Sequence, residues 1–434
     1  MATNPLKLEI HPLSSRLFTG STSYEEFPEG STSQDAKDRL SKLKATLEEG
    51  WLSKLIEDCG KNPVVEFSLA NDAIELIRRI VDSVTSEVGR AVVGLCVLQL
   101  TIKAICPDQS IRLHKGGVAK SSFSWVEGMP MRNLDKKFNA PVLRKYGLLN
   151  INADGVFMTR TLSENYPYSI YYKAAIKGAK NEWLALVEGL ENGSINAENG
   201  LRVMIGMLLN ESKEFEDLAT ELQGKLQTLK HKYKTLDEVR SFITYVIESA
   251  PHSARLFEIA MHSYFQVLDV HGSFGNGRLK PLTQMRSANK KHGNIGDIEV
   301  LGNLESGGSI VQAWDAKYGK TDLTLEFEEL KDKLRNQNHL NRVGFVVNLD
   351  HQRVGSDFPD LIFKDGNLEK SVEVVGFDKW IADYSKGSGL DSDLISSEWI
   401  QVFVECLCQQ RRAIAPIDEP TKAWVKHLLD LIEK

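Results

Sequence analysis

The chain has 434 residues, a length typical of two or three domains. Its 53 lysines and arginines against 59 aspartates and glutamates give a net charge of −6, and 42% of the residues are hydrophobic. This balance excludes a disordered tail protein and a uniformly basic coat protein, because both classes need more one-sided charge or less apolar content. It leaves room for nucleic-acid binding, which requires only a local basic surface.

The five cysteines are few, odd in number and scattered, which favours a reducing, cytoplasmic environment over a disulfide framework. Cys406 and Cys408 lie in an apolar run without a partner at zinc-ligand spacing, so we expect them to pack in a core. The amino terminus shows no signal-peptide pattern, and the apolar run from Ala91 to Ile105 is too short to span a bilayer. We therefore expect no membrane partner.

Residues 1–35 are rich in Ser, Thr, Gly and Pro, which predicts an irregular lead-in. Helical spacing then begins, with apolar residues at steps of three and four: Leu40, Leu43, Leu47, Trp51 and Leu55, and then Ile74, Ile77, Ile80 and Val81. Residues 181–250 also have a helical pattern, with many charges that suit a solvent-facing surface. We assign residues 36–250 to a mainly helical domain and residues 251–434 to a second domain.

Residues 131–161 have a more specific pattern within the helical part. Residues 132–138 predict one short helix, and Pro141 suits the first turn of a second helix that ends at Gly147. Asp154-Gly155 between two apolar runs predicts a β-hairpin. Two short helices and a hairpin resemble a helix-turn-helix with a wing, in which five basic residues face DNA: Arg132, Lys136, Lys137, Arg144 and Lys145. The alternative is an ordinary helical subdomain with a solvated basic face.

The stretch from residue 255 onward carries the clearest chemistry. An apolar helix is predicted over residues 256–265, and Glu258 stands among its core-type residues, where a carboxylate needs a partner. From Val270 to Gly296 the chain has no acidic residue and five basic ones: Arg278, Lys280, Arg286, Lys290 and Lys291. This segment predicts a local positive surface suited to backbone phosphates.

Two strands are predicted next, over residues 294–301 and 310–317. Alternation places Asp297 and Glu299 on one face of the first strand, and Asp315 and Lys317 on one face of the second. If the strands are neighbours, these four groups lie close together. Carboxylates beside an ammonium group suit a divalent cation such as Mg²⁺, with the lysine positioning a water molecule.

The pattern Gly296-Asp297, 17 intervening residues and Asp315-Ala316-Lys317 resembles the active-site signature of the PD-(D/E)XK nuclease superfamily. Its surroundings are most similar to a type II restriction endonuclease. The resemblance covers residues 255–380 and implies an α/β (α+β) core with a mixed sheet flanked by helices. It implies that Asp297, Asp315 and Glu258 hold Mg²⁺ and that Lys317 assists hydrolysis of double-stranded DNA by a homodimer. The family's next helix and strand match residues 326–336 and 342–348.

Two departures accompany this resemblance. Gly296 stands where the signature has proline, which we expect to cost little because the aspartate does the chemistry. A literal Pro359-Asp360 occurs later, but the following Glu373-Val374-Val375 lacks the lysine, so we interpret Pro359-Asp360 as a turn that opens a strand.

Other sites and functions are weaker. His262, His271 and His292 lack partners at metal-ligand spacing and are expected to pack or to contact phosphate. The absence of a Walker motif predicts no nucleotide cofactor. Two alternative functions remain: a non-catalytic DNA-binding regulator, whose acidic cluster would form structural ion pairs, and a repair or structure-specific nuclease.

Overall fold

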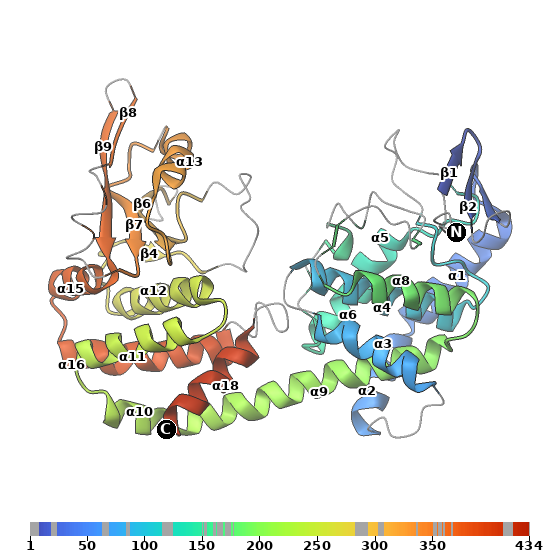
Figure 1. Cartoon of the computed structure of the whole chain (residues 1–434), viewed down its shortest axis with the longest axis horizontal. Helices are drawn as coiled ribbons and strands as arrows, with labels where there is room; N and C mark the ends of the chain where they lie inside the picture. The colour runs from blue at the N-terminus through green and yellow to red at the C-terminus, as the bar shows by residue number, and fades with distance from the viewer. Residues whose placement is uncertain are drawn as a thin grey trace, which may run out of the picture. The chain divides into compact units, whose positions relative to one another are not determined.

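The computed structural model describes the chain except for residues 1–7, 19–23, 63–68, 84–86, 115–124, 150, 152–153, 159–161, 163–167, 170–174, 177, 283–293, 303–307, 336, 350–353, 355–357, 359–360, 366–367, 411–419 and 434. The described residues form two compact units, which meet in the sequence between Phe215 and Glu216 (Figure 1). This junction lies within a single helix, α9 (Ala197–Gly224).

The junction differs from the domain boundary that we expected near residue 250. Helices α10 (Leu226–Lys232) and α11 (Leu236–Ser249) belong to the second unit. The reason is packing: both contact α16 (Ser392–Glu405), and α11 also contacts α12 (Ser253–Val270). The many charged residues on the outer faces of α10 and α11 gave no sign in the sequence that these helices pack against α12 and α16.

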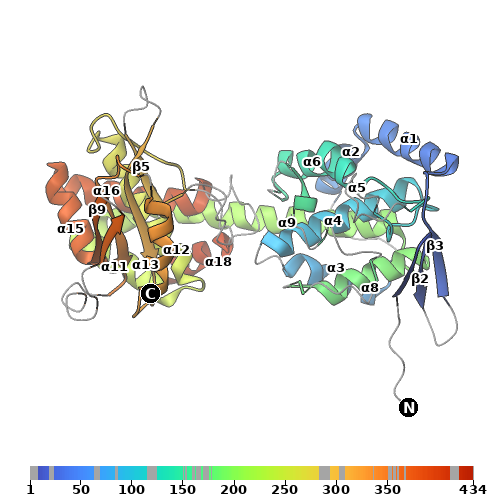
Figure 2. The same cartoon turned by 90° about the horizontal axis from the view of Figure 1, so that it is seen from above.

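The first unit begins with a three-stranded antiparallel sheet formed by β1 (Leu8–His11), β2 (Ser14–Phe18) and β3 (Tyr24–Pro28), seen side by side in Figure 2. The prediction of an irregular lead-in was therefore wrong for these residues. Leu17 and Phe27 are buried in the core of the unit, and this burial stabilises the strands. The polar composition of the segment gave no strand pattern in the sequence. Ser33 then caps the first helix, because its hydroxyl accepts a hydrogen bond from the Ala36 amide.

Helices build the rest of the first unit: α1 (Gln34–Glu48), α2 (Trp51–Lys61), α3 (Asn71–Asp82), α4 (Glu87–Ile105), α8 (Lys180–Glu191) and the start of α9. The apolar spacing from Leu40 to Leu55 covers two helices, because Gly50 adopts a left-handed φ of 78° between them. Helix α4 is buried along most of its length. None of the described helices combines the length and apolar character needed to cross a membrane.

The segment predicted to be a helix-turn-helix with a wing has a different structure. Helix α5 (Met131–Leu134), the π-helical turn η1 (Asp135–Asn139) and α6 (Ala140–Lys145) follow one another without a break. Pro141 has no backbone N–H and cannot donate the hydrogen bond of a regular helix, and the π-helical turn before it accommodates this missing bond. The expected second wing strand is instead the 3₁₀ turn η2 (Val156–Met158). The prediction of two helices and a hairpin was therefore wrong.

The second unit is built on a six-stranded mixed sheet, so the predicted mixed α/β class is confirmed. Its strand order is β4-β5-β6-β7-β9-β8. Strands β6, β7 and β9 are parallel, and the other neighbours are antiparallel. The strands are β4 (Arg278–Leu279), β5 (Ile298–Leu301), β6 (Ile310–Lys317), β7 (Arg342–Val347), β8 (Leu361–Asp365) and β9 (Leu368–Gly376).

Helices cover both faces of this sheet, as the alternation of β6 shows. Ala313 packs with Phe327 of α13 (Thr324–Leu334), whereas Trp314 packs against Trp380 of α15 (Phe377–Ser388). The predicted strand at 310–317 and the helix and strand after it are thus confirmed. The chain ends with α16, the π turn η4 (Cys406–Gln410) and α18 (Thr421–Ile432). Cys406 and Cys408 are buried in η4, as expected for packing residues.

Candidate active site

Pairing of β5 with β6 brings three of the predicted side chains together. Ile298 lies opposite Trp314, which places Asp297, just before β5, beside the end of β6. Asp297 Oδ2 accepts a hydrogen bond of 3.0 Å from the Ala316 amide, and its carboxyl group hydrogen-bonds Asp315. Lys317 Nζ lies 2.9 Å from Asp315 Oδ2. Two carboxyl groups and an amine therefore share one end of the β5–β6 pair.

Electrostatics make this cluster unusual. Burial, followed by the charges of Asp315 and Glu258, raises the pKa of Asp297 well above its ordinary value. Burial alone would lower the pKa of Lys317, but attraction to Asp315 and Asp297 outweighs it and raises that pKa. The amine is thus charged at neutral pH, and the two carboxyl groups repel each other unless a proton or a cation lies between them.

Glu258 approaches the cluster from α12, which crosses the sheet at β4, β5 and β6. Its charge acts on Asp297, as the raised pKa of that carboxyl group shows. One of its oxygens accepts a hydrogen bond from the buried guanidinium of Arg255, one helical turn earlier. Arg255 is therefore the partner that a carboxylate in this apolar helix required.

Glu299 does not join the cluster, although alternation predicted that it would. Its buried carboxylate accepts hydrogen bonds from the Ile295 and Gly296 amides and from Lys280 Nζ, at 2.5, 3.3 and 2.7 Å. The side chain turns back along its own segment, because residues 294–297 form a bend and the strand begins only at Ile298. Glu299 thus fixes the approach to β5 that positions Asp297.

Gly296, the departure from the proline of the signature, has a structural cause. A Cβ atom at this position would lie 2.7 Å from the carbonyl oxygen and 2.9 Å from the carbonyl carbon of Trp314. Both are backbone atoms of the neighbouring strand, which cannot move without shifting Asp315. A glycine is therefore required for the close approach of the two segments.

The donor set of the cluster fits a hard divalent cation. Mg²⁺ is commonly held by one or two carboxylates, with water and phosphate oxygens as its other ligands. Asp297 and Asp315 supply such a pair, and their mutual repulsion is relieved by a positive ion. Among the described residues, no group of three or more His, Cys, Asp or Glu side chains has the arrangement of a complete metal site. The observed set is the two-carboxylate kind.

Sequence reasoning missed Glu326 as a neighbour of the cluster. It lies in the first turn of α13, its side chain is 17% exposed, and it forms an ion pair of 2.8 Å with Lys320. Its charge contributes to the raised pKa of Lys317. The only sequence signal was its position nine residues after the lysine, at the start of a predicted helix.

The predicted basic segment after α12 is only partly described. Arg278 is exposed on the edge strand β4. Lys280 instead bridges Glu299 and the Asn294 side chain, at 2.7 and 2.8 Å, and so neutralises a buried carboxylate. Arg286, Lys290, Lys291 and His292 lie outside the described residues, as do Pro359 and Asp360. Glu373, from that second motif, forms a two-pronged ion pair with Arg342.

The five basic residues of the first unit are all exposed, but several have partners within the unit. Lys136 pairs with Asp154 at 2.7 Å and Lys137 with Glu48 at 2.6 Å. Arg132 donates to the Phe157 carbonyl, and Lys145 lies over the Tyr146 ring. Arg144 is also exposed on α6. Exposed ion pairs of this kind contribute little energy, so these side chains are available to a competing anion.

Two of the three histidines that we expected to pack or to contact phosphate are described, and only His262 is buried. His262 is buried and its Nε2 lies 3.0 Å from the Lys280 carbonyl oxygen, and His271 pairs with Glu398. Comparison of the sequence with models of protein families and with curated proteins finds no match.

Proposed function

We propose that this protein is a Mg²⁺-dependent endonuclease of the PD-(D/E)XK type that cleaves double-stranded DNA, with a type II restriction endonuclease as the best-supported role. The observation that carries the proposal is the convergence of Asp297, Asp315 and Lys317 at one end of the β5–β6 pair. The helix α12 before these strands, and α13 and the parallel strand β7 after them, are in the order that the resemblance implies.

Each side chain has a role in the proposed hydrolysis. Asp297 and Asp315 would hold Mg²⁺, and Glu258, whose charge acts on Asp297, would complete the metal shell directly or through water. The bound ion would supply a Lewis acid that polarises the phosphate. Lys317 is kept charged by Asp315, so it can orient the attacking water and stabilise the negative charge that develops on the phosphate oxygens. The bonding of Ala316 N–H to Asp297 keeps that carboxylate in place.

DNA binding is proposed to use basic side chains of the segment between α12 and β5. Arg278, with Arg286, Lys290 and Lys291, would neutralise backbone phosphates, so that affinity falls steeply with salt. Lys280 is a poorer candidate because Glu299 and Asn294 occupy its amine. The exposed basic residues of the first unit are proposed to contact DNA as well: Arg132, Lys136, Lys137, Arg144 and Lys145. A palindromic target would be cut by a twofold homodimer.

The test substitutes Asp315 and Lys317, one at a time. Asp315→Asn and Lys317→Ala should each leave the protein folded but lower the rate of DNA cleavage by about 10²–10³-fold or more, because transition-state charge loses its stabilisation. The matched controls are Asp383→Asn and Lys379→Ala, which break an exposed Asp–Lys ion pair on α15 in the same unit. Near-normal cleavage by both central variants, or cleavage that survives full chelation of divalent ions, would contradict the proposal.

Digestion of a long unmethylated plasmid in Mg²⁺ separates the alternative functions. Discrete fragments indicate a restriction endonuclease, whereas smears or junction cutting indicate a repair or structure-specific nuclease. An intact duplex with altered mobility indicates a DNA-binding regulator. The regulator has lost its main support, since residues 131–145 form one continuous helical segment rather than a helix-turn-helix.

A further inference from the structure

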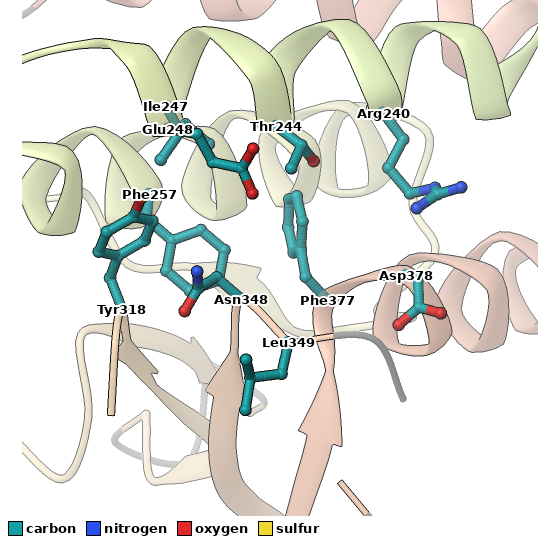
Figure 3. A pocket seen from close by; sticks show the side chains of 10 residues that line it. All are labelled: Arg240, Thr244, Ile247, Glu248, Phe257, Tyr318, Asn348, Leu349, Phe377 and Asp378. Carbon is teal, nitrogen blue, oxygen red and sulfur yellow. The ribbon is translucent and has the colours of Figure 1, made fainter. Parts of the chain in front are cut away.

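The side chains of β6 alternate between two surroundings, and the proposed catalytic pair lies on the side of α13. Tyr318, which follows the strand, turns to Phe257 of α12 and lines a pocket of about 290 Å³ beside α11 (Figure 3). Asp315 and Lys317 share the other face with Ala313, because neighbouring residues of a strand alternate. Ala313 is buried in the core that α13 forms on that face. The catalytic pair therefore faces α13 rather than the pocket.

The last turns of α13 hold the bend that precedes Asp297. Lys333 Nζ donates a hydrogen bond of 3.3 Å to the Ile295 carbonyl oxygen. The Ile295 side chain is buried in the same apolar core as Leu330 of α13. The amide of Ile295 donates to Glu299, so both backbone polar groups of this residue are fixed. Lys333 thus restricts the position of the bend, and with it the position of Asp297 at its end.

The first turn of α13 holds the segment that follows Lys317. The half-buried Glu326 carboxylate forms an ion pair of 2.8 Å with Lys320, three residues after the end of β6. Gly319 in this turn adopts a left-handed φ of 69°, and its amide donates a hydrogen bond of 2.7 Å to the Asn348 side chain, which follows β7. The turn is therefore held from α13 and from β7. The charge of Glu326 also helps to raise the pKa of the Lys317 amine.

One helix thus contacts both parts of the proposed catalytic cluster. Glu326 and Lys333 are about two helical turns apart in α13, so they lie on the same face, roughly 10 Å from each other along the axis. We propose that α13 sets the spacing between the carboxylate of Asp297 and the amine of Lys317, with Lys333 and Glu326 as positioning residues. The inference rests on the proposed nuclease function, because it assigns these two residues a role in that site.

The experiment uses two measurements on the full chain, because the two ends of the helix act on different groups. The first is the affinity for Ca²⁺, which replaces Mg²⁺ to prevent cutting, titrated by calorimetry with a duplex that contains the mapped cleavage site. The second is the single-turnover rate of cleavage in saturating Mg²⁺. Lys333→Met should weaken Ca²⁺ binding by about tenfold or more, as the loss of a group that orients a metal ligand commonly does, and Lys333→Arg should restore it. Glu326→Gln should lower the cleavage rate by about tenfold or more and leave the Ca²⁺ affinity unchanged.

The matched controls are Lys331→Met and Glu329→Gln, which make the same charge changes on the same helix. Lys331 pairs with Glu328, and Glu329 is exposed, so neither control should alter either measurement. Normal Ca²⁺ affinity but weaker DNA binding in Lys333→Met would identify Lys333 as a phosphate contact and overturn its positioning role. Unchanged cleavage by Glu326→Gln, or equal effects in the controls, would overturn the role of α13 alone. Absence of any metal-dependent cleavage by the unmodified protein would overturn the nuclease proposal and this inference with it.

Discussion

At the scale of single residues, the candidate site depends on a contact made by a glycine, a residue without a side chain. Gly296 lies against the backbone of Trp314, and this contact sets the distance between Asp297 on one segment and Asp315 on the next. The carboxyl group of Asp297 can bond the Ala316 amide only if that distance is short. The glycine therefore belongs to the geometry of the site, although it bears no reactive group.

Gly296→Ala should consequently impair both folding and cleavage. A methyl group forced against backbone atoms should lower the free energy of unfolding by about 1–3 kcal/mol. The displaced Asp297 should reduce cleavage by about 10²-fold, since small errors of position are costly in catalysis. Gly296→Pro, which restores the signature, should do no better.

The matched control for Gly296 is Gly387→Ala. Gly387 lies in α15 of the same unit, and among the described residues no atom beyond its chain neighbours and the backbone of its own helix lies within 4 Å of the added methyl group. Alanine there should be neutral or stabilise the helix by up to about 1 kcal/mol. Denaturant unfolding and plasmid cleavage, measured for both variants, check the pair. Equal behaviour of the two alanine variants would show that the contact with Trp314 is unimportant.

Lys280 gives a second prediction, which separates two interpretations of one residue. Glu299 is 2% exposed, and Lys280→Met would leave it buried without its cation. We expect a loss of about 3–5 kcal/mol in the free energy of unfolding, because an unpaired buried charge is costly. Lys280→Met combined with Glu299→Gln should recover part of it. If Lys280 instead served as a phosphate contact, the single variant would lower DNA affinity and its salt dependence while stability stayed unchanged.

The residues at this site show what the sequence could predict. Asp315 and Lys317 are two residues apart on a strand, so alternation alone places them together, and they pair at 2.9 Å. The same rule failed for Glu299, because its carboxylate bonds the amides of a bend that precedes the strand. Such a contact depends on the local path of the chain, which periodicity does not describe. The need for Gly296 was hidden for a similar reason, since it arises from the approach of another strand.

At the scale of elements, regular periodicity was reliable and turn chemistry was not. Strand β6 has the bounds predicted for it, and helix α13 begins and ends two residues before the helix that the family resemblance implied over residues 326–336. The Asp154-Gly155 pair suggested a hairpin, but Gly155 adopts a φ of 84° beside the buried Asp135. Asp135 accepts a hydrogen bond from the Val156 amide, and this long-range bond holds η2 as a 3₁₀ turn. A tertiary contact has overridden a local preference.

Two buried titratable groups hold this turn and predict a pH dependence of stability. His114 stacks on Phe157 of η2, and burial lowers its pKa to about 4. Because the unfolded chain binds the proton more readily, the contribution of His114 is lost as pH falls from 6.5 toward 4, by about 3 kcal/mol at most. Burial raises the pKa of Asp135 to about 6, so its contribution is present at low pH and is lost as pH rises through 6, by a similar ~3 kcal/mol.

The two contributions oppose each other, so single variants should reveal them. Relative to the unmodified protein, His114→Gln should gain about 3 kcal/mol of unfolding free energy between pH 7 and pH 4. Asp135→Asn should lose a similar amount over the same interval, whatever its stability at pH 7. Chemical denaturation at several pH values measures both differences. Parallel pH profiles for the three proteins would show that neither group is buried in the way that we describe.

At the scale of the whole molecule, the division of the chain was the least predictable feature. The sequence suggested a boundary near residue 250, where a helical and charged stretch gives way to motifs of the candidate site. The structure assigns α10 and α11 to the second unit instead. Whether an amphipathic helix packs on the preceding or the following part of the chain depends on the partner surface, and one sequence does not identify that surface. The sequence predicted the apolar face of α11, but it did not predict that this face packs against α12 and α16.

Two fragments test this division. Helix α11 buries five apolar side chains: Val239, Phe242, Ile243, Val246 and Ile247. At about 1.5–3 kcal/mol each, their burial contributes roughly 8–15 kcal/mol, which is as large as the ~5–15 kcal/mol stability of a whole domain. A fragment of residues 216–434 should therefore unfold cooperatively in denaturant. A fragment of residues 251–434 should lack a cooperative transition and bind a hydrophobic dye, because α12 and α16 lose their cover. Equal cooperativity of the two fragments would show that α11 is dispensable, and that the boundary suggested by the sequence was the better one.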